Sequence, residues 1–98
     1  MNILIVDDKP ANLLALRKIL VKPGLDIIEA TSGNDALALL LKYDFALILL
    51  DVQMPDMDGF ETAEIIRGNE ETKSIPIIFV TAISKEQKYI FEGYEKGA

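Results

Sequence analysis

The sequence has 98 residues, of which 50% are hydrophobic and 27% are charged, and this composition is typical of a single small folded domain. Cysteine and histidine are both absent, which excludes a disulfide framework, a thiolate metal site and a histidine general base. The net charge of −6 argues against direct binding to nucleic acid or to an anionic membrane surface.

The first predicted element is a strand at Ile3–Val6, a continuous apolar run of the kind found in strands buried on both faces of a sheet. Pro10 then favours the first turn of a helix. Apolar residues at helical spacing predict one buried face, and Lys22-Pro23-Gly24 predicts the end of this helix. The residues of that predicted face are Leu13, Leu16, Ile19 and Leu20.

The second strand is predicted at Asp26–Ala30, whose mixed polarity suits the edge of a sheet. Ser32 followed by Asp35 resembles a capping box and predicts the start of a second helix. Phe45–Leu50 is the most apolar stretch of the sequence, and we expect it to form a central strand. The apolar residues assigned to the second helix are Leu37, Leu40 and Leu41.

The last part of the chain continues the same alternation of helices and strands. Asp58 and Glu61 have the spacing of a second capping box and predict a third helix. Ile75–Val80 is the fourth predicted strand, and the proline near its start is tolerated there. Ser84 with Gln87 predicts the start of a fourth helix.

Alternating strands and helices with short connections predict right-handed crossovers and a parallel sheet that is covered on both faces. We therefore expect residues 1–98 to form one α/β domain with a doubly wound sheet. The longest apolar run, Phe45–Leu50, is far too short to span a bilayer, and no basic leader precedes Ile3. These features predict a cytoplasmic protein.

Polar residues follow three of the four predicted strands, at the edge where ligands bind in sheets of this kind. Asp7 and Asp8 follow the first strand, Asp51 follows the third, and Thr81 with the small Ala82 follows the fourth. Three carboxylates that meet at one edge repel one another unless a cation neutralises them. An oxygen-only ligand set selects a hard ion such as Mg²⁺, and a carboxylate beside such an ion can accept a phosphoryl group.

Taken singly, each of these residues has an ordinary structural explanation. An aspartate at the end of a strand is commonly a turn or helix-cap residue, and a threonine there commonly caps or extends the strand. Residues 54–59 can likewise be read as a turn followed by a helix cap. Their joint placement favours a shared site, because the ordinary explanation requires four coincidences.

Three blocks of the sequence resemble the motifs of response regulator receiver domains of two-component signalling. They are Val6-Asp7-Asp8, the sequence Leu-Asp-Val-Gln-Met-Pro-Asp-Met-Asp-Gly at residues 50–59, and Val80-Thr81-Ala82. The resemblance covers essentially the whole chain and implies a flavodoxin-like fold with strand order 2-1-3-4. Residues 7–16 are also similar to receivers attached to sensor kinases or to cyclic-dinucleotide enzymes.

The resemblance implies a metal-assisted phosphoacceptor site. Asp51 would be the phosphoacceptor and a ligand of Mg²⁺. Asp8 would bind the metal directly, and Asp7 would bind it mostly through water. The backbone carbonyl of Gln53 would supply a further metal ligand.

The resemblance also implies how the site would switch and what it would react with. Thr81 would supply a switch hydroxyl to the phosphoryl oxygens, and Ala82 would leave room for the incoming group. The donor would be a phosphohistidine on a sensor histidine kinase or a histidine phosphotransfer protein. The domain would not be an enzyme in the usual sense, because it would catalyse only its own phosphorylation and dephosphorylation.

Family members continue beyond Gly97-Ala98 with a fifth strand, a Lys-Pro turn and a fifth helix, so we expect this chain to be incomplete at its C-terminus. The missing lysine contacts the phosphoryl group, and losing one such contact typically costs about 3 kcal/mol of transition-state stabilisation. Metal binding is then expected to survive weakly while switching is largely lost. An exposed edge at residues 75–80 would also favour a homodimer.

Three other classes of function can be compared with this interpretation. A flavin- or nucleotide-binding protein would need a hydroxyl- or glycine-rich phosphate loop where Asp7-Asp8-Lys9-Pro10 stands. A phosphatase of the haloacid dehalogenase type needs a second acid two residues after its nucleophile, where this chain has Gln53. An interaction module that works without phosphorylation stays open, because the lysine of the family is missing.

Overall fold

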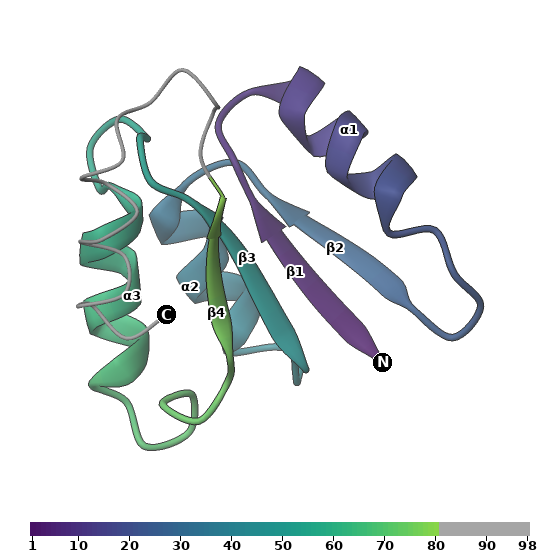
Figure 1. Ribbon diagram of the computed structural model, residues 1–98. Coiled ribbons are helices and arrows are strands. Elements are labelled where there is room, and N and C mark those ends of the chain that lie inside the picture. The colour runs from purple at the N-terminus through teal and green to yellow at the C-terminus, as the bar shows by residue number, and fades with distance from the viewer. Residues whose placement is uncertain (81–98) are drawn as a thin grey trace.

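The computed structural model describes residues 1–80 as alternating strands and helices (Figure 1). In chain order they are β1 (Asn2–Val6), α1 (Pro10–Ile19), β2 (Asp26–Ala30), α2 (Gly33–Leu40), β3 (Leu47–Asp51), α3 (Gly59–Arg67) and β4 (Ile77–Val80). The helix predicted to begin at Ser84 lies outside the described residues. Among residues 1–80, no helix combines the length and apolar character that crossing a bilayer requires.

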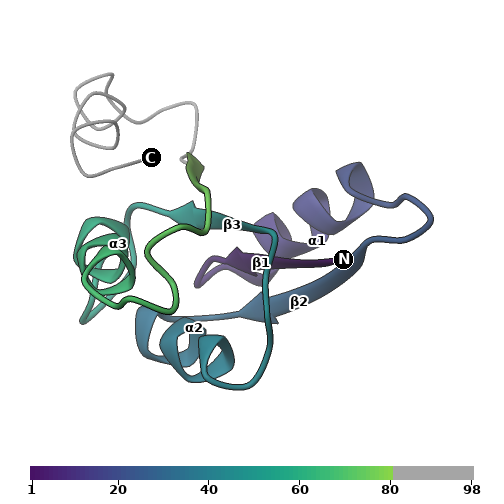
Figure 2. The same cartoon turned by 90° about the horizontal axis from the view of Figure 1, so that it is seen from below.

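The strands form one parallel sheet in the order β2-β1-β3-β4, which confirms the predicted fold class and strand order. Helix α1 covers one face of this sheet, while α2 and α3 lie on the other (Figure 2). The described residues are therefore layered as the alternating pattern predicted. The residue pairs that set the register are Asn2 with Asp26, Ile3 with Leu47, and Ile48 with Ile77.

The central strand β1 supplies side chains to a separate core on each face of the sheet. Leu4 and Val6 pack in the cluster that contains residues of α2 and α3. Ile3 and Ile5 pack in the cluster that contains Leu13 of α1. Successive side chains of a strand point to opposite faces, so a strand buried on both faces requires a continuous apolar run.

Two residues assigned to buried helix faces are exposed. In α1, Leu13 is buried and Leu16 and Leu20 pack beside it, but Ile19 is 73% exposed. At 100° per residue, Ile19 lies about 120° around the helix from Leu13, so it points away from the sheet. Leu41 was expected to continue the apolar face of α2, but it is the C-cap residue of that helix and is 80% exposed.

Two predicted strands begin two residues later than their apolar runs do. The run at Phe45–Leu50 becomes β3 at Leu47–Asp51, and the run that starts at Ile75 becomes β4 from Ile77. For β4 the reason is Pro76, which has no backbone N–H to donate, although its carbonyl accepts a hydrogen bond from Ile48 at 2.9 Å.

Three predicted helix starts are confirmed, and two of them have the predicted side-chain capping contact. Pro10 occupies the first turn of α1. The Ser32 hydroxyl accepts a hydrogen bond from the backbone N–H of Asp35 at 3.0 Å, at the start of α2. Asp58 and Glu61 form a complete capping box at the start of α3, in which each side chain accepts from the backbone of the other residue.

Replacing Asp58 with alanine is expected to lower the free energy of unfolding by about 1 kcal/mol, because the N–H of Glu61 loses its acceptor. Chemical denaturation followed by circular dichroism measures this change. Asp58→Asn is the matched control, since asparagine caps helices about as well as aspartate and should cost only a few tenths of a kcal/mol. Equal stability of Asp58→Ala and the unaltered chain would contradict the role of this cap.

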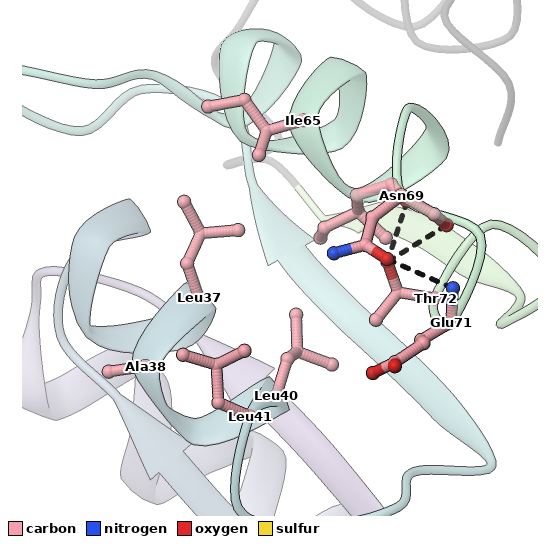
Figure 3. Close-up of a pocket in the computed structure, with 9 residues that line it drawn as sticks. Leu37, Ala38, Leu40, Leu41, Ile65, Asn69, Glu71 and Thr72 are labelled. Atoms are coloured by element: carbon pink, nitrogen blue, oxygen red, sulfur yellow. Dashed lines mark hydrogen bonds between the residues drawn. The ribbon is translucent and has the colours of Figure 1, made fainter.

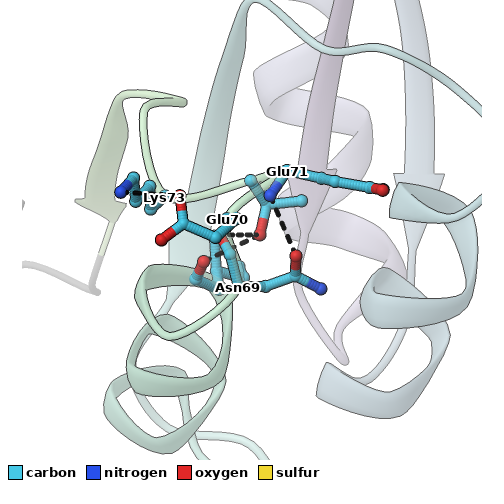
Figure 4. A network of polar contacts seen from close by, with 6 residues as sticks. Asn69, Glu70, Glu71 and Lys73 are labelled. Atoms are coloured by element: carbon cyan, nitrogen blue, oxygen red, sulfur yellow. Dashed lines mark hydrogen bonds and ion pairs between the residues drawn. The ribbon is translucent and has the colours of Figure 1, made fainter.

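The connection between α3 and β4 is fixed by local polar contacts (Figure 4). The Asn69 side-chain carbonyl accepts from the N–H of Glu71 at 2.9 Å, and Glu70 forms an exposed ion pair with Lys73 at 2.8 Å. Exposed ion pairs contribute little to stability. The buried Thr72 hydroxyl donates to a carbonyl in the last turn of α3 at 2.7 Å, and the Arg67 guanidinium donates to two carbonyls of the connection at 2.7 and 2.8 Å, so these contacts anchor it.

Candidate functional site

Three aspartates meet at the carboxyl ends of two neighbouring strands. Asp7 and Asp8 directly follow β1, and Asp51 is the last residue of β3. One carboxylate oxygen from each of the three residues lies within 4.8 Å of the others. Asp7 and Asp51 are each only 3% exposed, and Asp8 is partly buried. The structure therefore brings the acidic candidates together where water screens their charges poorly.

The sheet fixes the backbone at both ends of this cluster. The strands β1 and β3 are parallel neighbours, so the residues that follow them lie at the same edge of the sheet. The N–H of Asp7 donates to the carbonyl of Ala30 at 3.1 Å, which extends the pairing of β1 with β2 by one residue. Asp51 lies opposite Val80 in the register of β3 and β4. Each carboxylate therefore projects from backbone that is paired with a neighbouring strand.

The side chain of Asp7 is held by two hydrogen bonds from the chain that follows it. Its Oδ1 accepts from the backbone N–H of Lys9 at 2.9 Å, and its Oδ2 accepts from the side-chain amide of Asn12 at 3.1 Å. Asn12 belongs to the first turn of α1, so the start of this helix contacts the acidic cluster directly. Each oxygen of Asp7 keeps acceptor capacity for one more partner.

The first residue of α3 packs against the backbone of Asp51. The N–H of Gly59 donates to the carbonyl of Val52 at 2.8 Å. A Cβ at position 59 would overlap the carbonyl oxygen of Asp51 and would lie 2.9 Å from both the carbonyl carbon of Asp51 and Cα of Val52. Glycine is therefore required here by close approach of two backbone segments rather than by a turn.

The acidic cluster fits a hard divalent cation. Oδ1 of Asp8 is buried, and within residues 1–80 it accepts no hydrogen bond. Buried polar atoms almost always have a partner, so an orphan carboxylate oxygen beside two other acids suggests a bound cation. Every candidate donor is an oxygen atom, which suits Mg²⁺ or Mn²⁺ and not Zn²⁺ or Cu²⁺.

The other predicted site residues, Gln53, Thr81 and Ala82, do not belong to the cluster of three aspartates. Gln53 lies two residues beyond β3 with an exposed side chain, and the role of its backbone carbonyl stays a prediction. Thr81 and Ala82 lie outside the described residues. In the sequence they directly follow Val80, which pairs with Asp51.

Two residues that contact the acidic residues were given no role by sequence reasoning. The position of Asn12 in the sequence could have indicated its contact with the site, because the third residue of a helix that starts at Pro10 lies close to the end of the preceding strand. Gly59 ended a recognised motif, but a sequence cannot show which backbone atoms approach a glycine.

An apolar hollow of about 200 Å³ lies between α2 and α3, and none of the three aspartates lines it (Figure 3). Leu37, Leu40 and Leu41 form one side, with Ile65 across from them on α3. Glu71 is its one charged lining residue in the described part of the chain, so the hollow offers no set of groups for catalysis or metal binding.

Comparison with known sequences identifies the family. The family model of the response regulator receiver domain matches residues 3–98. The transcriptional regulatory protein SrrA of Staphylococcus aureus is 38% identical over 97 residues, which cover 99% of this chain and 39% of that protein. The chain thus spans 39% of the length of the curated relatives it matches first.

Solved structures agree with this assignment. The chemotaxis protein CheY4 of Vibrio cholerae has a TM-score of 0.86 and 32% identity, covering 99% of this chain and 80% of that one. The receiver domain of a signal transduction histidine kinase from Syntrophus aciditrophicus has a TM-score of 0.85 and 31% identity, covering 99% and 73%. The Mn²⁺-bound form of response regulator Rcp1 has a TM-score of 0.83 and 26% identity, covering 99% and 76%. The resemblance found in the motifs is therefore confirmed, and the chain belongs to the family of response regulator receiver domains.

Proposed function

We propose that this chain is a phosphoacceptor signalling domain in which Asp51 receives a phosphoryl group. The observation that carries this proposal is the position of Asp51, a carboxylate that is 3% exposed at the end of β3. Carboxylate oxygens of Asp7 and Asp8 lie within 4.8 Å of it, so the site can hold the cation that phosphoryl transfer requires.

Asp51 is the nucleophile of the proposed reaction. One of its carboxylate oxygens forms a bond to phosphorus while the P–N bond of a phosphohistidine breaks, and the imidazole leaves with the electron pair. The product is an acyl phosphate on Asp51, which water later hydrolyses. The reaction depends on positioning and charge neutralisation rather than on a general base, so the absence of histidine does not oppose it. The domain acts only on itself.

Asp7, Asp8 and Asp51 are the proposed side-chain ligands of Mg²⁺, with the backbone carbonyl of Gln53 as a further ligand. When bound, the ion supplies positive charge against the carboxylates and the phosphoryl oxygens. The Mn²⁺-bound form of Rcp1 supports this choice, because Mn²⁺ is a hard ion with similar oxygen ligands. Thr81 contributes its hydroxyl and Ala82 contributes space beside the phosphoryl group.

The proposed partner is a sensor histidine kinase or a histidine phosphotransfer protein in the cytoplasm. Membership of the receiver family supports this partner, since such domains work in two-component signalling.

Incubation of the chain with acetyl phosphate and Mg²⁺ tests the proposed function. We expect an intact mass higher by one phosphoryl group, loss of the adduct in base, and no adduct when EDTA removes the metal. Absence of an adduct at saturating Mg²⁺ would overturn the proposal and would favour an interaction module that works without phosphorylation.

Asp8→Asn is expected to change stability in opposite directions with and without Mg²⁺. In metal-free buffer the variant loses a repulsive charge from the cluster, so its free energy of unfolding rises by about 1 kcal/mol. At a Mg²⁺ concentration of a hundred times the dissociation constant, the unaltered chain gains about 2.7 kcal/mol from binding, and the variant gains little of this. Denaturation curves in EDTA and in Mg²⁺ measure both effects.

Asp44→Asn is the matched control for this experiment, because Asp44 is exposed and the substitution changes the net charge equally. It should leave the stabilisation by Mg²⁺ unchanged. Equal stabilisation of Asp8→Asn and the unaltered chain by Mg²⁺ would remove Asp8 from the metal site.

A further inference from the structure

The side chain of Asn12 joins helix α1 to the acidic cluster. Its amide nitrogen donates to Oδ2 of Asp7 at 3.1 Å, while the backbone N–H of Lys9 donates to Oδ1 of the same carboxylate at 2.9 Å. The two donors come from different parts of the chain, one from the connection after β1 and one from the first turn of α1. Together, the two donors fix both oxygens of the Asp7 carboxylate.

This pair of contacts restricts the rotation of the Asp7 side chain. A carboxylate with a single hydrogen bond can still turn about its Cβ–Cγ bond, whereas two donors on opposite oxygens fix the plane of the group. Asp7 is 3% exposed, so protein donors and not bulk water set its orientation in the unaltered chain. The amide of Asn12 is therefore the side-chain contact that sets which way this carboxylate faces.

Asp7 and Asp8 differ in what the protein supplies to them. Both oxygens of Asp7 already accept hydrogen bonds from the protein, whereas Oδ1 of Asp8 accepts none from the described residues. A carboxylate oxygen that already accepts one hydrogen bond has a remaining lone pair for a cation or for a water on that cation. A hydrogen bond from an outer residue commonly fixes the orientation of a metal-binding carboxylate.

We propose that Asn12 is a positioning residue, whose amide holds the Asp7 carboxylate in the orientation that faces the cation. This inference rests on the proposed function, since it gives Asn12 a role at the same metal site. Asn12 itself touches neither the cation nor the phosphoryl group. Its effect passes through Asp7, so it governs the affinity for Mg²⁺ and leaves the chemistry at Asp51 unchanged.

Asn12→Ala tests this role through metal affinity. We expect a dissociation constant for Mg²⁺ about tenfold higher than that of the unaltered chain, measured by isothermal titration calorimetry. Labelling by acetyl phosphate should need correspondingly more Mg²⁺ for half its maximal rate, but should reach the same maximal rate once Mg²⁺ is saturating. In metal-free protein, the amide of Lys9 should exchange its hydrogen faster, because its acceptor is no longer held.

Two further variants separate positioning from a general effect on the fold. Asn34→Ala removes another exposed amide from the first turn of a helix, α2, whose side chain makes no hydrogen bond within residues 1–80, so Mg²⁺ affinity should stay unchanged. Asn12→Gln keeps an amide donor and should restore part of the affinity. A lower melting temperature of Asn12→Ala with unchanged Mg²⁺ affinity would overturn the inference. Absence of Mg²⁺ binding by the unaltered chain would instead overturn the proposed function, and this inference with it.

Discussion

Replacement of Asp51 by asparagine is expected to remove essentially all phosphoryl labelling by acetyl phosphate and Mg²⁺. Asparagine has nearly the same shape as aspartate, so the end of β3 keeps its pairing with β4. Its amide is not a nucleophile and cannot form the acyl phosphate. The intact mass of the treated variant should therefore equal that of the untreated one, and circular dichroism should show that the variant is folded.

The stability of Asp51→Asn distinguishes loss of the nucleophile from loss of the fold. Asp51→Asn removes one charge from three crowded carboxylates, so relief of their repulsion offsets the contacts that the carboxylate loses, and the metal-free variant should remain folded. If the variant is folded, the loss of labelling is caused by the missing nucleophile and not by unfolding. The exposed control Asp44→Asn should be labelled normally. Equal labelling of Asp51→Asn would show that another residue is the acceptor.

Gly59→Ala is expected to lower the free energy of unfolding by about 3 kcal/mol, the upper range for forcing an extra methyl group into packed structure. The added Cβ meets backbone atoms of Asp51 and Val52, and backbone at the end of a paired strand cannot move aside as a flexible side chain can. The start of α3 or the end of β3 must shift. Urea denaturation measures the loss of stability.

The same substitution should disturb the site in molecules that remain folded. A shift of the Asp51 backbone moves its carboxylate relative to Asp7 and Asp8, so labelling should fall even under conditions where the variant is fully folded. Gly68→Ala is the matched control, because a Cβ there would lie 3.4 Å from the nearest atom, the carbonyl oxygen of Glu64. Normal stability of Gly59→Ala would contradict the close approach seen here.

Much of the fold was predictable because its signals are local. The continuous apolar run of β1 indicated a strand buried on both faces, and the polar pairs at Ser32 and Asp58 marked helix starts through hydrogen bonds between residues three apart. The errors arose where apolar residues sit at element ends. Ile19 lies about 120° around α1 from the buried Leu13, and Leu41 is the C-cap residue of α2, so neither continues the buried face of its helix.

The candidate site was predictable only as far as strand order allowed. Knowing that the first and third strands are neighbours is enough to bring Asp7 and Asp51 to one edge. The orientation of each carboxylate depends on contacts that the pattern does not reveal, such as the amide of Asn12 on Asp7. The hollow between α2 and α3 was also missed, because it depends on how two helices pack and not on any motif.

The register of the sheet has a consequence for the order in which the domain assembles. Ile3 of β1 lies opposite Leu47 of β3, so β1 cannot complete its pairing during synthesis until more than half of residues 1–80 has followed it. Closing such a long loop is entropically unfavourable before any contact compensates for it, and this slows folding. Because the three acids come from the ends of these same two strands, they are gathered only once that distant pairing has formed. A nascent or partly folded chain in which β1 and β3 are not yet paired therefore has no acidic cluster.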